Sequence, residues 1–277
     1  MNAPRFVDLQ THSTASDGVL SPTAVVEAAA RVSLSALALT DHDSIAGVAE
    51  AEAAGARLGV RIVAGVELSA FHDDDEYHLL GLHIQDRDAL EVELRGFREE
   101  RVERARRIVA RLDELGVPVT LEAVLRQAGP GAVGRPHVAR ALLEAGHVKD
   151  FREAFDRFLG WGKPAFVEKG TLSVTDAIAL LHRCGALAVW AHPGDLATET
   201  RLGRLQALGL DAVEVLHPSH PQPLAERIYD RAERLGLLPS GGSDWHGNTD
   251  GPRQLGGQHV PYIWLARQDD AMRERFA

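Results

Sequence analysis

Short runs of apolar residues alternate with longer amphipathic segments along most of this chain. The short runs have the length and composition of strands and are FVDLQTH, ALALTDHD, RIVAGVE, EYHLLGL, LAVWAH, DAVEVLH and LPSGGSDWH. The segments SPTAVVEAAARVS and SIAGVAEAEAAGARLG, which lie between the first runs, have the pattern of helices. This alternation predicts parallel strands joined by crossover helices, which is an α/β fold.

Local signals delimit the first helices and one break in the alternation. Ser21 followed by Pro22 is a typical helix start, and Gly59 is a typical helix stop. After His83 the chain changes to charged helical segments, and strand–helix alternation resumes only at SVTDAIALLHRCG and ALAVWAH. We therefore predict a barrel formed by residues 1–86 and 171–277, with a helical insertion at 87–170 that covers the active site.

Ionisable side chains gather at the ends of the apolar runs. About seven strands are expected, a number that favours a closed or nearly closed barrel over a small open sheet. In a parallel barrel the C-terminal ends of all strands meet at one rim, so residues that are distant in sequence converge there. The pattern predicts a site at this rim.

Residue types that bind metal ions dominate these strand ends. The candidate ligands are His12, Asp17, His42, Glu67, His78, His192, Asp244 and His246. Coordination of a cation offsets the cost of burying imidazole and carboxylate groups. Glu67 can bridge two cations, and His78 and His192 can complete the second ion. We assign His72, His147, His182, His220 and His259 to the surface or to packing and leave His83 and His217 open.

Composition and charge limit the classes of molecule that we expect this chain to bind. A formal net charge of −10 argues against a broad basic surface, so no long nucleic acid is expected, whereas a small anion remains compatible. Cys184 is the only cysteine, which excludes an intrachain disulfide and favours a reducing compartment. No run approaches the roughly 18 apolar residues of a membrane span. We expect a cytoplasmic protein without a membrane partner, and nothing in the sequence indicates a protein partner.

The predicted insertion contains basic residues suited to binding phosphate. Arg135 and His137 lie beside Gly134 in GRPHVAR, where glycine and proline predict a turn facing the barrel mouth. Arg101 and Arg104 are further candidates for the same phosphate. Most other arginines between Arg95 and Arg111 are expected on a solvated helix face paired with glutamates.

Several motifs occur together in a fixed order: DLQTHSTASDG, LALTDHD, GVE, the histidine of EYHLLGL, AHPG and GSDWH. In this order they resemble the polymerase and histidinol phosphatase (PHP) family of metal-dependent phosphoesterases over nearly the whole chain. The resemblance implies an α/β fold, a distorted (β/α)7 barrel of the PHP type with an inserted helical domain. It also implies two or three divalent ions, with Mn²⁺ favoured and Fe²⁺, Zn²⁺ or Mg²⁺ as alternatives.

The resemblance further implies which residues surround each ion. His12, Glu67 and Asp244 would surround one ion, Glu67, His78 and His192 a second, and Asp17, His42 and His246 a third. The family has a histidine at the position where this chain has Gln10. Because an amide oxygen is a weaker donor to transition-metal ions than imidazole nitrogen, we expect Gln10 to bind its ion loosely or through water.

TASDG and RPHVAR are most similar to nucleotide phosphatases that act on 3',5'-bisphosphonucleotides. The expected reaction removes the 3'-phosphate of 3'-phosphoadenosine 5'-phosphate to give AMP. Asp244 would orient or deprotonate the attacking water, and His246 would contact the phosphate or assist the leaving oxygen. The alternatives are a 5'-to-3' exoribonuclease acting on short 5'-phosphorylated RNA, a small-molecule phosphatase similar to histidinol phosphatase, and a metal-binding module whose catalysis has decayed.

Overall fold

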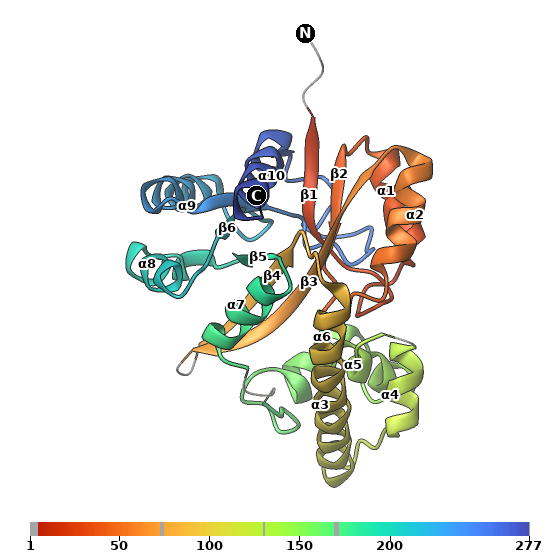
Figure 1. The fold of residues 1–277 in the computed structure, drawn as a ribbon. Helices are drawn as coiled ribbons and strands as arrows, with labels where there is room; N and C mark the ends of the chain where they lie inside the picture. Colours follow the sequence, from red (N-terminus) through yellow and green to blue (C-terminus); the bar gives the residue numbers. More distant parts are fainter. Residues whose placement is uncertain (1–4, 73–74, 130, 169–171, 277) are drawn as a thin grey trace.

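The sheet of this protein is an eight-stranded, nearly closed barrel (Figure 1). The computed structural model describes residues 5–72, 75–129, 131–168 and 172–276. The strand order is β7-β6-β5-β4-β3-β2-β1-β8. The strands are β1 (Phe6–Thr11), β2 (Ala36–Leu39), β3 (Arg61–His72), β4 (Asp75–Leu82), β5 (Leu187–Trp190), β6 (Ala212–Leu216), β7 (Leu238–Gly241) and β8 (Val260–Pro261). The predicted α/β barrel is confirmed, with one short strand more than the seven expected.

Strand β4 departs from the predicted parallel arrangement. It runs antiparallel to both β3 and β5, and β8 runs antiparallel to β1, whereas the other pairs are parallel. A residue near the start of β4 therefore lies at the same rim as the residues that follow the parallel strands, such as those just beyond β5. His78 illustrates this, because its carbonyl oxygen accepts a hydrogen bond (2.9 Å) from the amide of Ala191, just beyond β5.

The prediction that a strand ends at Glu67 is wrong. Strand β3 has 12 residues and continues to His72, because its second half forms a ladder with β4. Glu67 pairs with Leu80 in this ladder and is 1% exposed. The carboxylate is thus held by hydrogen-bonded backbone on both sides of it.

The barrel is nearly closed where the chain after β7 runs along β1. The Asp244 amide donates to the Gln10 carbonyl at 3.0 Å, and the His12 amide donates to the Trp245 carbonyl at 2.9 Å. A Cβ atom on Gly242 would lie 2.6 Å from the backbone nitrogen of Gln10, so this close approach requires glycine. The seam between the two strands carries residues expected at the site.

Helices cover the outside of the barrel. They are α1 (Pro22–Arg31), α2 (Val48–Leu58), α7 (Val174–Arg183), α8 (Glu199–Ala207), α9 (Gln222–Leu235) and α10 (Tyr262–Arg275), with a short 3-10 helix at Gly194–Leu196. The predicted start of α1 is confirmed, because the Ser21 hydroxyl accepts from the Ala24 amide and Pro22 is the first helical residue. The stop after α2 is also confirmed, with Gly59 in the left-handed region at φ 71°.

A group of helices lies between β4 and α7 and projects to one side of the barrel (Figure 1). It comprises α3 (Arg87–Glu114), α4 (Leu121–Ala128), α5 (Arg135–Glu144), α6 (Phe151–Ala154) and a π-helical turn (Phe155–Leu159). These helices have a hydrophobic cluster of their own, which includes Ile108, Leu112, Val124, Val138 and Leu142.

The same helices also contact the barrel at the loop that follows β1. The Ala132 amide donates to the Ala15 carbonyl at 3.2 Å, and Arg140 donates to the Asp17 carbonyl at 2.9 Å. The loop after β1 is therefore packed between the barrel rim and α5. No helix of the described residues is both long and apolar enough to cross a membrane.

Candidate metal centre

The side chains expected to bind metal ions converge at one rim of the barrel. His12 follows β1, His42 follows β2, Glu67 and His78 lie within β3 and β4, His192 follows β5, Asp244 and His246 follow β7, and Asp17 lies in the loop after β1. They form three groups, and within each group the ligand atoms lie within 4.8 Å of one another. Group 1 is His12, Glu67 and Asp244; group 2 is Glu67, His78 and His192; group 3 is His12, Asp17, His42 and His246.

Group 1 is fully buried at the seam of the barrel. His12 Nε2 lies 3.2 Å from Glu67 Oε2 and 3.1 Å from Asp244 Oδ1. His12 has no exposed surface, and the carboxylates are 1% and 4% exposed. Two carboxylates on either side of one imidazole concentrate negative charge where water cannot screen it, so the position favours a cation.

The other oxygen of Glu67 belongs to group 2. Glu67 Oε1 lies 2.6 Å from His78 Nδ1 and 3.4 Å from His192 Nε2. The two carboxylate oxygens thus face two different sets of histidines. This is the arrangement that allows one carboxylate to bridge two ions.

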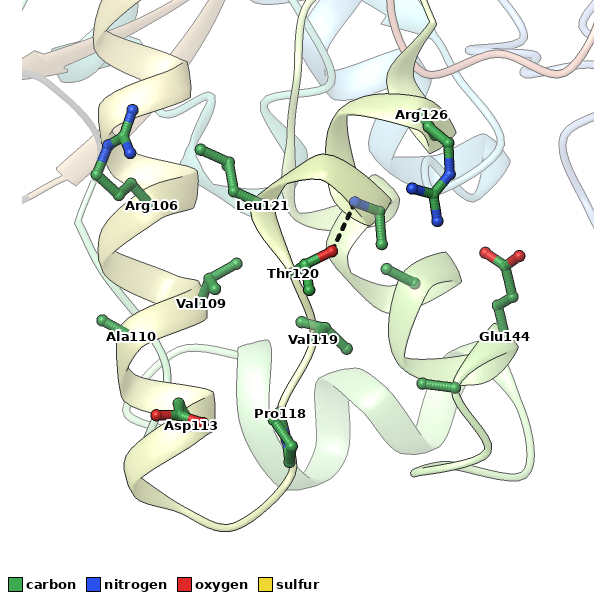
Figure 2. A pocket seen from close by; sticks show the side chains of 13 residues that line it. Arg106, Val109, Ala110, Asp113, Pro118, Val119, Thr120, Leu121, Arg126 and Glu144 are labelled. Atoms are coloured by element: carbon green, nitrogen blue, oxygen red, sulfur yellow. Dashed lines mark hydrogen bonds between the residues drawn. The ribbon is translucent and has the colours of Figure 1, made fainter.

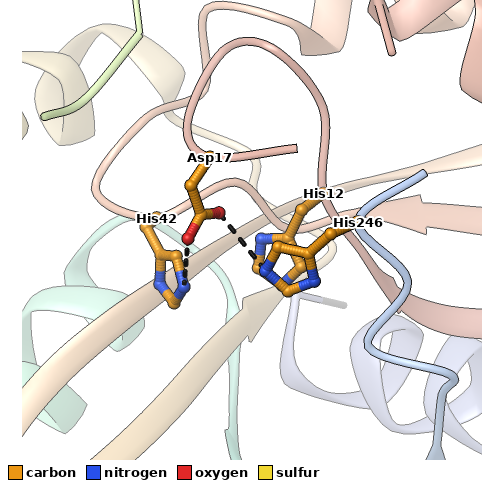
Figure 3. Close-up of side chains that lie close together, drawn as sticks. All are labelled: His12, Asp17, His42 and His246. Atoms are coloured by element: carbon orange, nitrogen blue, oxygen red, sulfur yellow. Dashed lines mark ion pairs between the residues drawn. The ribbon is translucent and has the colours of Figure 1, made fainter. Parts of the chain in front are cut away.

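Group 3 shares His12 with group 1, and its four side chains lie close together (Figure 3). Asp17 points between two histidines, with 3.3 Å from its Oδ1 to His246 Nε2 and 3.9 Å from its Oδ2 to His42 Nε2. His246 Nδ1 lies 2.8 Å from the Asp244 carbonyl oxygen, which can only accept. The proton therefore sits on Nδ1, and the lone pair of Nε2 faces Asp17.

These donors fit divalent cations. Within the described residues, both ring nitrogens of His12 and the Nδ1 of His42 are buried without making a hydrogen bond. Buried polar atoms of this kind normally have a partner. Carboxylate and imidazole groups that face one another in this way supply the ligand types of Mn²⁺, Fe²⁺ and Zn²⁺.

The charges of the site agree with this fit. Burial lowers the pKa of His42 to about 3 despite the nearby carboxylates of Glu67 and Asp17, which favours the uncharged ring that binds a metal ion. Burial acts to raise the pKa of Glu67, but His42 and His78 outweigh it and hold that pKa well below its ordinary value. Glu67 is thus ionised in the barrel.

Two of these residues occupy the left-handed backbone region. His192 has φ 31° and Asp244 has φ 51°, values that cost a residue other than glycine about 1–3 kcal/mol. Hydrogen bonds hold both turns: the His192 amide donates to Glu214 Oε2 at 2.7 Å, and the Asp244 amide donates to the Gln10 carbonyl. Such strain gathers at functional sites.

Gln10 lies beside group 1 and contacts Glu67. Its side chain has no exposed surface, and its Nε2 donates to Glu67 Oε2 at 3.0 Å. The sequence analysis counted Gln10 among the candidate metal ligands, and the structure places its side chain against the carboxylate of Glu67.

Three arginines from the helices between β4 and α7 lie near one another beside the rim. Arg101 pairs with Asp43 Oδ2. Arg104 donates to the Val167 carbonyl at 2.8 Å, and Arg135 donates to the Leu159 carbonyl at 3.3 Å and lies over the Phe166 ring. Burial, followed by the neighbouring charges of Arg135 and Arg101, lowers the pKa of Arg104 to about 9. Among the described contacts of these three arginines, the carboxylate of Asp43 pairs with Arg101.

His137, which we expected to contact phosphate, is buried beside the start of α5. The side chain is 1% exposed, and its Nδ1 accepts a hydrogen bond from the Gly134 amide at 2.9 Å. Burial lowers its pKa to about 4. This arrangement satisfies a free amide at the start of α5 and keeps the ring of His137 buried.

Two residues that sequence reasoning did not assign to the site contact Asp244, namely His217 and Arg253. His217 Nε2 lies 3.6 Å from Asp244 Oδ2, and the Ser219 amide donates to its Nδ1, so Nε2 carries the proton. Arg253 lies 2.8 Å from Asp244 Oδ2 and is half exposed. His217 was left open because a histidine that follows a strand has no further signal, and Arg253 lies in a polar loop with no motif.

A cavity of 870 Å³ lies elsewhere, among α3, α4 and α5 (Figure 2). It is lined by Arg106, Val109, Thr120, Arg126 and Glu144 among others, and it shares no residue with the three groups. Arg126 pairs with Glu122 and Arg106 with Glu103, so these charges are already matched. The cavity is separate from the rim.

The sequence of this chain is similar to a family model and to several proteins of known function. The family model of the PHP domain matches residues 8–94. A 3',5'-nucleoside bisphosphate phosphatase of Chromobacterium violaceum is 39% identical over 258 residues, which cover 90% of each chain. The 5'-3' exoribonuclease Rnm of Escherichia coli is 36% identical over 269 residues, covering 94% of this chain and 88% of the relative.

Solved structures match the fold over almost its full length. A protein of Bifidobacterium adolescentis, described as a metal-dependent phosphoesterase, superposes with a TM-score of 0.87 at 30% identity and covers 96% of both chains. A protein of Chromobacterium violaceum described as an amidohydrolase, with bound sulfate and no metal, has a TM-score of 0.84 at 36% identity and the same coverage.

Proposed function

Because the chain belongs to the PHP family of metal-dependent phosphoesterases, we propose that it removes the 3'-phosphate of 3',5'-bisphosphonucleotides such as 3'-phosphoadenosine 5'-phosphate. The chain is a phosphoester hydrolase by family, and the substrate is our proposal. One observation carries it: a rim with donors for several cations lies beside three arginines, of which Arg101 pairs with a carboxylate and Arg104 and Arg135 donate to backbone carbonyls. Cations bound at the rim would attract one phosphate and the arginines a second, which suits a substrate with two phosphates.

The proposed ions are two or three divalent cations, with Mn²⁺ favoured over Fe²⁺, Zn²⁺ and Mg²⁺. Groups 1, 2 and 3 would each hold one ion, with Glu67 shared by the first two groups. Bound divalent ions would supply Lewis-acid stabilisation of the phosphoryl oxygens and lower the pKa of a water molecule. The chain's own residues then orient the reactants.

Asp244 and His246 are the proposed reaction residues of the chain. Asp244 reaches the centre of group 1 and can orient the attacking water through the oxygen that does not face His12. The Nδ1 proton of His246 is committed to the Asp244 carbonyl, which favours a ligand or phosphate-contacting role over proton donation to the leaving oxygen.

The proposed second phosphate site is the arginine group. Arg104 and Arg135 both lie within electrostatic reach of Glu76, which is 3.2 Å from His78 of group 2. The arginines are thus close enough to the ligand groups for one nucleotide to reach both. Guanidinium groups that are partly shielded from water bind phosphate through charge-assisted hydrogen bonds. Arg135 is the proposed contact for the 5'-phosphate, with Arg101 and Arg104 adding positive charge.

A second candidate activity is 5'-to-3' exoribonuclease action on short 5'-phosphorylated RNA. The identity to an exoribonuclease over 94% of this chain supports it. The same geometry suits both reactions, because the arginines would hold a terminal 5'-phosphate while the next phosphodiester is cut at the ligand groups. Both reactions release a nucleoside 5'-monophosphate.

Product analysis separates these activities. Protein in Mn²⁺ is offered 3'-phosphoadenosine 5'-phosphate and a short 5'-phosphorylated RNA at equal concentration, and phosphate, AMP and shortened RNA are quantified over time. Faster release of phosphate and AMP supports the bisphosphonucleotide proposal, and faster stepwise release of mononucleotides from RNA overturns it in favour of the exoribonuclease.

Matched variants tie the activity to the rim. Asp244→Asn removes a charged candidate ligand, and Asp156→Asn removes a carboxylate that is 67% exposed on the distant helices. Activity lost in Asp244→Asn and kept in Asp156→Asn is the expected result. Equal activity in both variants would exclude Asp244 from the reaction.

A further inference from the structure

Gln10 gives group 1 a different ligand chemistry from groups 2 and 3. Glu67 carboxylate oxygens can only accept hydrogen bonds, so the Gln10 amide must face Glu67 Oε2 through its Nε2. This fixes the direction of the amide, which leaves Gln10 Oε1 on the other side. Among the described residues, Oε1 is buried and has no hydrogen-bond partner.

The amide acts on group 1 in two ways. Its N–H occupies a lone pair of Glu67 Oε2, the oxygen that lies 3.2 Å from His12 and faces group 1. Its oxygen lies on the side away from Glu67 Oε2, so the residue supplies no imidazole nitrogen to the group. The first effect weakens the hold of the carboxylate on a cation, and the second leaves the group with the single imidazole of His12.

The donor sets of the groups therefore differ in hardness. Group 1 offers one imidazole nitrogen and two carboxylate oxygens. Group 2 offers two imidazoles with one carboxylate, and group 3 offers at least two imidazoles with one carboxylate. Imidazole-rich sets retain transition-metal ions, whereas oxygen-rich sets suit Mg²⁺ and Mn²⁺ and exchange them more readily.

We propose that group 1 is a labile site for a hard divalent ion, filled from solution by Mg²⁺ or Mn²⁺, while groups 2 and 3 retain their ions, and that Gln10 causes the difference. This inference rests on the proposed function for the metal-binding role of the three groups. It adds that the sites are unequal and that one residue of this chain makes them so.

Counting of retained ions tests the proposal without any measurement of turnover. Full-length protein is loaded with Mn²⁺, dialysed against graded concentrations of a chelator, and analysed for metal per chain by mass spectrometry. One ion is expected to leave at a free Mn²⁺ concentration at least about tenfold higher than the other two, the size of effect known for residues that support metal ligands. Replacement of that ion alone by millimolar Mg²⁺ is expected in the same samples.

Two substitutions assign the effect to Gln10. Gln10→His supplies an imidazole at the same buried position, and we expect the labile ion to be retained with the other two. Gln206→His is the matched control, because Gln206 is exposed near the C-terminal end of α8, away from the rim. A histidine added at this position is expected to leave the free Mn²⁺ concentration at which the labile ion is lost unchanged.

Three equally retained ions in the unaltered protein would overturn the proposal, and this result does not depend on whether a variant folds. Unchanged lability in a folded Gln10→His protein, judged by circular dichroism, would also overturn it. The failure of the proposed function is recognised separately, by the absence of phosphate release from nucleotides in a protein that still shows unequal retention.

Discussion

Arg135 is the residue on which the preference for a 5'-phosphate is proposed to depend, so its removal should act on one substrate and spare another. The perturbation is Arg135→Ala. The guanidinium lies 5.4 Å from the centre of the Phe166 ring and has one described hydrogen bond, to the Leu159 carbonyl. Its remaining N–H groups are thus available to a ligand.

The size of the effect follows from these contacts. A hydrogen bond between charged groups contributes about 1.5–3 kcal/mol. Arg101 and Arg104 remain in the variant and keep part of the positive charge, so we take this range as the loss for one phosphate contact. At 1.4 kcal/mol for each factor of ten, kcat/KM for 3'-phosphoadenosine 5'-phosphate should fall about 10- to 150-fold.

The assay compares two substrates that differ only in the 5'-phosphate. Phosphate release is measured from 3'-phosphoadenosine 5'-phosphate and from adenosine 3'-monophosphate, in the unaltered protein, in Arg135→Ala and in the control Arg152→Ala. Arg152 is 89% exposed on α6. We expect a loss in Arg135→Ala for the bisphosphate and less than about a threefold change for the monophosphate. Equal losses for both substrates would refute a role for Arg135 in reading the 5'-phosphate.

Two further predictions concern metal loading and stability. Arg253 pairs with Asp244 and competes with a cation for this carboxylate. Because a half-exposed ion pair contributes up to about 1 kcal/mol, Arg253→Ala should tighten Mn²⁺ binding in calorimetric titrations by about two- to fivefold. Weaker binding in the variant would contradict this competition. Burial acts to raise the pKa of Asp211, but His182 and Arg275 outweigh it and lower that pKa. Asp211 therefore stabilises the fold above about pH 4, and this contribution is lost as the pH falls through its lowered folded pKa. Asp211→Asn should reduce the free energy of unfolding by about 2–3 kcal/mol at pH 7 in urea titrations and flatten its dependence on acid pH; an unchanged acid dependence argues against this pair.

Much of the barrel could be predicted because local chemistry determines it. Ser21 and Pro22 start α1, and Gly59 ends α2, through backbone and capping preferences that act within a few residues. The convergence of His12, His42 and His192 could be predicted because these residues follow parallel strands, whose ends meet at one rim. These inferences need only short-range signals and one rule of topology.

The direction of β4 and the length of β3 could not be predicted in this way. A strand that runs antiparallel has the same apolar pattern as one that runs parallel, and only its pairing with β3 and β5 defines it. Glu67 therefore looked like a strand end although the ladder continues past it. Here the tertiary pairing overrides the local signal.

Contacts between distant side chains were equally hidden. Asp43 pairs with Arg101 across 58 positions of sequence, and His217, which follows β6, lies 3.6 Å from Asp244, which follows the neighbouring strand β7. His137 appeared suited to phosphate, but the geometry of the turn at Gly134 directs its ring into the protein. Such contacts depend on how the helices between β4 and α7 meet the rim, which no motif records.

The most direct test of a metal-dependent phosphoesterase site at the rim is phosphate release from 3'-phosphoadenosine 5'-phosphate by protein that has been stripped of divalent ions and then restored. We predict no release above background by the stripped protein, recovery on addition of Mn²⁺, and no recovery in the variant His192→Ala, which lacks one ligand of group 2. The same rate before and after stripping, or full recovery in His192→Ala, would contradict the account.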